Sequence, residues 1–230
     1  MKQYIFKTGL AGAFVLAGAV SASAALLDFT NQSDGTYGVR SAAIASGTLA
    51  DGNSWTLLPT PSTFQLSYVT SDAPMGDAST APLKGDNDGV GVQRPGRVDD
   101  EITAPREMIT LAFKNTVKLS ALYFLDLFRE AQAGHETALV SVDGAAEVNF
   151  DAQEVFAMGG FGFGSFATSL VGKSFTFSAG VVDPLNNDGV GQPDYALAGV
   201  DVSPVPLPAG LLLLGGALGG LGLARRRRKS

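Results

Sequence analysis

The two-residue spacing of apolar side chains through the middle of the chain constrains the fold most strongly. In residues 108–113, Ile109, Leu111 and Phe113 alternate with more polar neighbours, and residues 117–125, 137–143 and 174–179 repeat the spacing. Successive side chains of a strand point to opposite faces, so this pattern predicts strands with one buried face. Weaker strand candidates are residues 26–30, 36–43, 54–58, 63–69, 147–150 and 195–202.

The order of these segments favours an all-β domain. Short alternating strands separated by Gly, Pro, Asn and Asp, without intervening helical units, predict an antiparallel β-sandwich of the jelly-roll type. Residues 119–132 also fit a helical face that would end at Gly134, but strand through about Leu127 is the prediction. Residues 71–105 are rich in proline and glycine and should form the longest loop. The glycine-rich segment 159–166 is expected to be a packed strand or a loop.

The N-terminus has the pattern of a secretory signal peptide over residues 1–24. Lys2 and Lys7 are followed by an apolar helical segment, residues 8–20, and then by a small-x-small cleavage pattern at Ala22 and Ala24. The apolar run is short for a membrane span, which needs about 20 residues. We therefore expect export, cleavage after Ala24 and a mature chain that begins at Ala25.

The C-terminus, residues 204–230, contains three signals in order. A proline-framed motif is followed by the uncharged run 209–224, which is expected to form a thin transmembrane helix, and then by a basic cluster. Basic residues beside a span stay cytoplasmic, so residues 25–203 are predicted to be an exported domain. The motif is Val205, Pro206, Leu207, Pro208 and Ala209, and the cluster is Arg225, Arg226, Arg227, Arg228 and Lys229.

This tail resembles the PEP-CTERM sorting signal of bacterial surface proteins, in the variant whose prolines frame a leucine (VPLPA). The resemblance implies that an exosortase, a membrane-embedded cysteine transpeptidase, recognises the motif, removes the helix and the basic cluster, and passes the protein to the cell surface or the exopolysaccharide matrix. A more loosely similar stretch, residues 88–102, resembles a segment of other exported PEP-CTERM domains and implies a shared sandwich architecture. The alternative is a permanent tail anchor, although six glycines among residues 209–224 weaken such a helix.

Charge and composition narrow the function classes. Residues 25–224 hold nine basic and 22 acidic side chains, a net charge of −13, which argues against nucleic-acid binding. The absence of Cys excludes thiol catalysis, and a single histidine, His135, cannot form a two-histidine zinc site. His135 is expected to be exposed rather than catalytic. We therefore expect a protein without catalytic activity.

The pentapeptide at residues 87–91, Asn-Asp-Gly-Val-Gly, recurs at residues 187–191 and is first of all a turn signal. Dense carboxylates repel one another unless they are solvated or bridged by a cation, so one structural calcium ion is expected beside the first copy. Its candidate ligands are Asp86, Asp88, Asp99, Asp100 and Glu101.

The alternative function is a carbohydrate-binding module in exopolysaccharide or biofilm assembly. Such a site needs exposed aromatic rings that stack on sugars, and the candidates are Trp55, Tyr68, Tyr123 and Tyr195. Trp55 lies within a predicted strand, so a place in the core is expected for it. The expected partners are thus an exosortase and the membrane, with exopolysaccharide under the alternative.

Overall fold

Two long strands, β7 (Met108–Leu125) and β12 (Phe163–Ala179), pair with each other and form the centre of the fold. The computed structural model describes residues 24–30, 41–42, 44–67, 82–84, 89–93, 101–130, 134–152, 163–180, 193–205, 217 and 219. Every strand pair among these residues is antiparallel. The other strands are β1 (Ala25–Asp28), β2 (Ser41–Ala42), β3 (Ala45–Thr48), β4 (Ser54–Thr60), β5 (Gln65–Ser67), β6 (Gly91–Gln93), β8 (Arg129–Glu130), β9 (Gly134–His135), β10 (Thr137–Val142), β11 (Val148–Asp151) and β13 (Ala196–Pro204).

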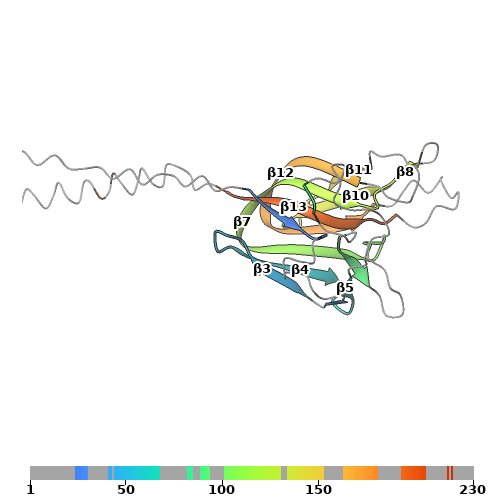
Figure 1. Cartoon of the computed structure of the whole chain (residues 1–230), viewed down its shortest axis with the longest axis horizontal. Coiled ribbons are helices and arrows are strands. Elements are labelled where there is room, and N and C mark those ends of the chain that lie inside the picture. The colour runs from blue at the N-terminus through green and yellow to red at the C-terminus, as the bar shows by residue number, and fades with distance from the viewer. Residues whose placement is uncertain are drawn as a thin grey trace, which may run out of the picture.

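Both long strands lie at the centre of one eight-stranded sheet, in the order β1-β13-β7-β12-β10-β11 with β3 and β4 added at β7. This sheet bends so that β3 and β4 lie in a different layer from β13 (Figure 1). In one layer, the second half of β7 lies between β12 and β13, and β13 pairs with β1. In the other layer, the first half of β7 pairs with β4, and the second half of β12 pairs with β10. The register between β7 and β12 shifts where these strands pass from one layer to the other. Ala112 faces Ser174 before the shift, and Val117 faces Gly172 after it. We call this place the corner: residues 113–116 of β7 with Lys173 of β12.

The core lies between the two layers and is rich in aromatic side chains. Phe124 of β7 is fully buried, and its ring centroid lies 5.1 Å from that of Tyr195 and 5.8 Å from that of Phe166. In the other layer, Phe113 and Phe175 meet edge to face at 6.1 Å. Edge-to-face contacts suit the ring quadrupoles, and each buried ring stabilises the fold by about 1.5–3 kcal/mol through removal of apolar surface from water. Burial of the alternating apolar residues therefore explains the strands.

The predicted strands at 108–113 and 117–125 are one strand, β7, and residues 119–125 are strand rather than helix. β12 begins inside the glycine-rich segment 159–166, so the period-two segment 174–179 is only the last part of a longer strand. Six other predictions are confirmed to within two residues at each end. Residues 26–30, 54–58, 63–69, 137–143, 147–150 and 195–202 correspond to β1, β4, β5, β10, β11 and β13.

The prediction of one long loop over residues 71–105 was wrong in part. Residues Gly91–Gln93 form β6, which pairs with β5, and Val90 forms a bridge to Leu197 at the start of β13. The side chains of Val90, Val92 and Ile102 are fully buried. Tertiary burial has overridden the local turn signals, because each apolar residue gains more from the core than the flanking glycines and prolines cost. The short strand β3 was also missed.

The predicted terminal helices lie outside the described residues. Of residues 1–24 only Ala24 is described, and of residues 204–230 only Pro204, Val205, Ala217 and Gly219. Within the described part of the chain, no helix combines the length and the hydropathy that a membrane span requires. The signal peptide and the C-terminal span therefore stay predictions.

Candidate functional site

The first and last strands bring the two predicted processing points to one end of the domain. β1 and β13 pair so that Ala25 faces Val202, while Pro204, the last residue of β13, faces Val117 of β7. Ala24 is exposed, and Val205 is 39% exposed. The chain therefore enters the fold after the predicted signal cleavage site and leaves it before the predicted sorting motif, at neighbouring positions beside the corner.

Most residues of the predicted processing signals lie outside the described part of the chain. The structure describes Ala24 and Val205, and it describes neither Ala22 nor the rest of the motif, Pro206, Leu207, Pro208 and Ala209. The basic cluster, Arg225, Arg226, Arg227, Arg228 and Lys229, is not described either. The motif follows β13 directly, because Pro204 is the last residue of β13 and Val205 is the first residue of the motif.

The proposed calcium ligands lie mostly outside the described residues as well. Glu101 is described, whereas Asp86, Asp88, Asp99 and Asp100 are not. Within the described ranges, no three His, Asp or Glu side chains are grouped so that they could hold a metal ion. The calcium site therefore stays a prediction.

The described backbone around that segment places it against the start of β13. Val90 exchanges two hydrogen bonds with Leu197, and the Val92 N–H donates to the Glu101 carbonyl oxygen at 2.9 Å. The Ile102 N–H donates to the Tyr195 carbonyl oxygen at 2.7 Å. Gly89 of the first pentapeptide has a φ of +101°, a conformation that favours glycine, while Val90 and Gly91 already pair with other strands. The flanks of residues 94–100 thus converge beside Asp194, which follows the second copy.

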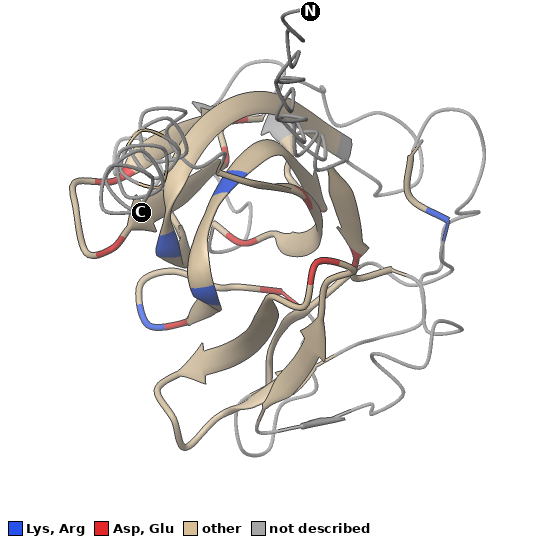
Figure 2. Ribbon diagram, turned by 90° about the vertical axis from the view of Figure 1, so that its left-hand side faces the viewer, with Lys and Arg blue, Asp and Glu red and all other residues tan. Residues whose placement is uncertain are grey.

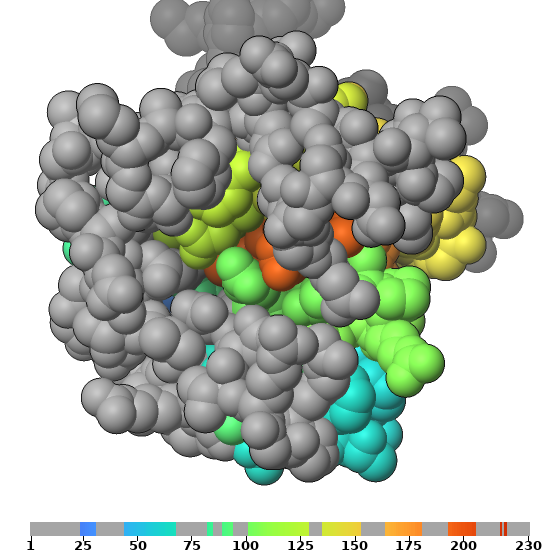
Figure 3. All heavy atoms as spheres, turned by 90° about the vertical axis from the view of Figure 1, so that its right-hand side faces the viewer, coloured from blue at the N-terminus to red at the C-terminus, as the bar shows by residue number. Residues whose placement is uncertain are grey.

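This end of the domain faces the viewer in Figure 3, where atoms of the segment that precedes β7 (bright green) lie against atoms of β13 (orange). Here the structure reveals a partly buried carboxyl group that the sequence did not indicate, that of Glu136. Its Oε2 accepts the Phe128 N–H at 2.7 Å, and its carbonyl oxygen accepts the Ala152 N–H at 2.9 Å. Glu136 thereby connects the start of β10 to Phe128, which follows β7, and to Ala152, which follows β11.

Burial raises the pKa of the Glu136 carboxyl from its ordinary value near 4.5 to about 7, and the negative charge of Glu101 adds to the increase. Hydrogen bonds from Phe128 and Asp194 act in the opposite direction but do not offset the burial. A carboxyl group with a pKa near neutrality can exchange a proton within the physiological range. In the sequence, Glu136 lies in a polar connection between predicted strands, and no local pattern indicates its burial.

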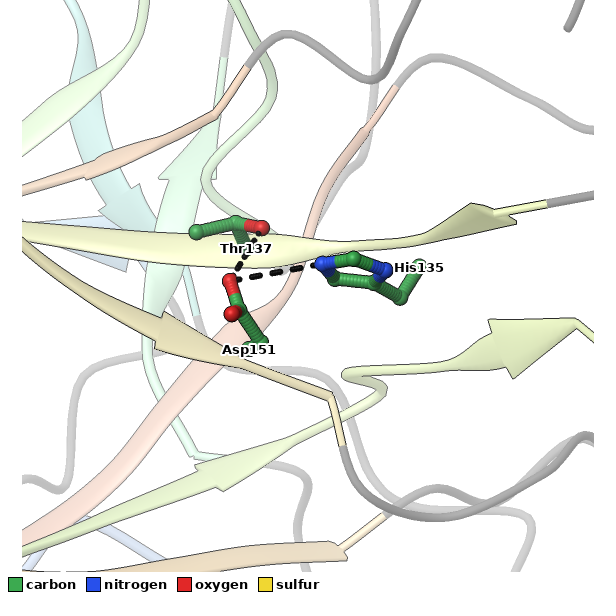
Figure 4. Close-up of polar contacts among 3 residues, drawn as sticks. All are labelled: His135, Thr137 and Asp151. Carbon is green, nitrogen blue, oxygen red and sulfur yellow. Dashed lines mark hydrogen bonds and ion pairs between the residues drawn. The ribbon is translucent and has the colours of Figure 1, made fainter.

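The single histidine is exposed, as expected, and it contacts an acid on a neighbouring strand (Figure 4). His135 Nε2 lies 3.4 Å from Asp151 Oδ1, and both side chains are about half exposed, at 46% and 57%. The Thr137 hydroxyl donates to the same Asp151 oxygen at 2.9 Å. A nucleophile has to give its proton to the histidine, whereas Thr137 gives its proton to the acid. These three residues therefore lack the contact that activates a hydroxyl.

The aromatic residues suggested for a sugar platform are buried wherever the structure describes them. Trp55 is 2% exposed and its ring packs edge to face on Phe29, which confirms its expected place in the core. Tyr195 is fully buried, and Tyr123 is 6% exposed, with its hydroxyl donating to Asp201 at 3.0 Å. Tyr68 lies outside the described residues. None of the three described rings is placed to stack on a sugar in solution.

Comparison of the chain with family models, curated proteins and solved structures found no significant match.

Proposed function

We propose that the chain is an exported cell-surface or extracellular-matrix protein without catalytic activity, which an exosortase sorts and cleaves near its C-terminus. The domain would be a β-sandwich of the jelly-roll type between residues 25 and 203. One observation carries the proposal: the first strand begins at Ala25 and the last ends at Pro204, so the described strands stop at both predicted processing points. This supports the proposal that residues 204–230 are a sorting signal and not part of the folded domain.

The position of the motif also supports processing over permanent anchoring. Pro206 and Pro208 lack an N–H and disfavour helix in the residues before them, so the segment between β13 and the apolar run is expected to be extended. A protease binds its substrate as an extended chain, and Val205 is already exposed at the end of β13. The motif would be the substrate, and the chemistry would belong to the exosortase.

Mass spectrometry of the mature protein from the producing cells tests this function. We expect surface-located protein to lack residues 210–230, and the double variant Pro206→Ala/Pro208→Ala to retain them in the membrane fraction. Ser203→Ala, one residue before the end of β13, is the matched control and should be processed normally. An intact Arg225–Ser230 tail on surface-located protein would contradict sorting. So would equally efficient delivery of a chain truncated after Pro204.

The described aromatic residues do not support the alternative of a carbohydrate-binding module. Affinity electrophoresis in gels that contain the exopolysaccharide of the producing organism measures binding of the domain to this polymer directly. A structural matrix protein should migrate as it does in a gel without polysaccharide. Retardation that increases with polysaccharide concentration would favour a binding module.

A further inference from the structure

The end of the domain at which the chain enters and leaves has a distinct set of side chains. We define this exit end as the start of β1, the end of β13 and the corner between β7 and β12. Figure 2 views the domain from this side, and the ribbon facing the viewer carries basic segments on its strands. The Ala25–Val202 and Pro204–Val117 pairs fix both chain ends beside the corner.

The proposed sorting signal holds the exit end close to a membrane, and the inference rests on that proposed function. Only residues 205–208 separate β13 from the apolar run, so five steps of at most about 3.6 Å join Pro204 to Ala209. The exit end therefore lies within about 18 Å of the hydrocarbon. Headgroups occupy roughly 5–8 Å of that distance on each side of the bilayer. The remaining gap is about one Debye length at physiological salt, so charges on the exit end interact with charged lipids.

Three lysines lie at the exit end. Lys118 of β7 faces Val171 of β12 on one side and Ser203 of β13 on the other, and this row lies on the outer face because the neighbouring Val117 and Leu119 are buried. Lys114 and Lys173 are exposed at the corner. Val171 beside them is 50% exposed, which adds an apolar contact.

Acidic side chains are distributed differently. Asp51 and Asp143 lie in turns at the exit end, and Asp143 Oδ1 accepts the backbone N–H groups of Lys173 and Ser174 at 3.0 and 2.8 Å. Asp201 lies on the outer side of β13, two residues before Ser203 and opposite Leu26 of β1. At the opposite end, where β7 ends and β13 begins, the described residues include five acids. They are Glu101, Asp126, Glu136, Asp151 and Asp194. This separation of charge gives the otherwise acidic domain a preferred orientation in the field of an anionic surface.

We propose that the exit end docks on the anionic phospholipid headgroups of the membrane that tethers the chain, through Lys114, Lys118 and Lys173. Each lysine near such a surface strengthens partitioning by about fivefold, and the acidic opposite end is repelled. Docking holds the domain upright on its own tether and presents the motif between the domain and the bilayer. Removal of the tether releases the domain, because three lysines against the remaining acidic charge do not retain it.

The test uses the full chain reconstituted into vesicles of phosphatidylcholine, with and without phosphatidylglycerol. An impermeant amine-acylating reagent followed by mass spectrometry measures the exposure of each lysine. Lys84 is the internal standard, because it is exposed and its N–H donates to Asp28 at the far end of β1. We expect phosphatidylglycerol to lower acylation of the three lysines on the order of threefold relative to Lys84, and high salt to restore it.

A second readout uses Trp55, the only tryptophan, which pairs with Phe113 at the corner. Energy transfer from Trp55 to dansyl-labelled headgroups should increase when phosphatidylglycerol is present. The variant K114Q/K118Q/K173Q should lose this increase, and the control K84Q/R106Q, which removes exposed charges elsewhere, should keep it.

Equal acylation ratios and equal energy transfer in both vesicles would overturn the docking. Stronger protection of the lysines by a soluble anionic polysaccharide than by phosphatidylglycerol would overturn it in favour of a matrix polymer. A chain that fails to float with vesicles after an alkaline wash would refute the tether and the docking together. A chain that floats without lysine protection would refute the docking alone and leave the sorting function standing.

Discussion

At the scale of single residues, the partly buried carboxyl of Glu136 links the stability of the domain to pH. Its pKa is raised to about 7 in the folded chain, whereas in the unfolded chain it is near 4.5. The neutral form is therefore favoured by folding, so this contribution is fully present below about pH 4.5 and is lost as the pH rises through 7. Glu136→Gln keeps a neutral acceptor for the Phe128 N–H.

We expect wild type to lose about 2–3 kcal/mol relative to Glu136→Gln between pH 4.5 and pH 8, measured by urea unfolding across this range. Glu147→Gln, which removes an exposed carboxylate, is the control and should follow the wild-type profile. Parallel profiles for wild type and Glu136→Gln would contradict the assignment.

Gly89 is the second residue with a specific requirement. Its φ of +101° favours glycine, and a Cβ there would lie 2.6 Å from the Leu197 carbonyl oxygen. Gly52 has a comparable φ of +82°, but a Cβ at this position would have no neighbouring atom within 4 Å. Gly52→Ala should therefore cost about 1–2 kcal/mol from the backbone alone, and Gly89→Ala about 3 kcal/mol or more, measured by chemical unfolding. Equal losses of unfolding free energy in the two variants would show that β13 moves away from the added Cβ at position 89 without destabilising the fold.

At the scale of elements, the turn between β3 and β4 is fastened to the corner by one side chain. Asn53 is 4% exposed, its Oδ1 accepts the Asn115 N–H at 2.9 Å, and its Nδ2 donates to the Asn115 carbonyl oxygen at 3.4 Å. Asn53→Ala leaves both backbone groups without this partner and should cost about 2 kcal/mol in thermal unfolding. Asn115→Ala keeps those backbone groups and should change stability by less than about 0.5 kcal/mol. Similar losses in both variants would count against the Asn53 contact.

At the scale of the whole molecule, the predicted calcium ion would link the segment before β7 to the rest of the domain. A site filled at about 100 times its Kd stabilises the fold by about 2.7 kcal/mol, which raises the Tm by roughly 5–10 °C for a domain of this size. We expect this increase with calcium over chelator, and its loss in Asp99→Asn/Asp100→Asn. Glu147→Gln should retain it. Identical melting curves in calcium and in chelator would exclude a structural ion.

Local spacing along the chain is enough to predict the longer strands of the middle, and it also predicts where the exported domain ends. The strand signal is local, because a period of two along β4, β7 or β10 needs no knowledge of a partner. The processing motifs are linear as well, so Val205–Ala209 is legible without a fold and stays a prediction until cleavage is measured.

The contacts between segments that are distant in sequence follow only from the fold. The burial of Val90 and Val92 could not be predicted from the turn-rich sequence around them. Val90 pairs with Leu197, which is far away in sequence, and Val92 bonds to Glu101, which lies in a segment without periodic spacing. The burial of Glu136 likewise depends on three separate segments meeting. The pairing of β1 with β13 spans nearly the whole domain, and together with the pairings of β13 and β12 with β7 it brings both processing points and the three lysines of the exit end together. Such pairings follow from long-range register and burial, which no local spacing encodes.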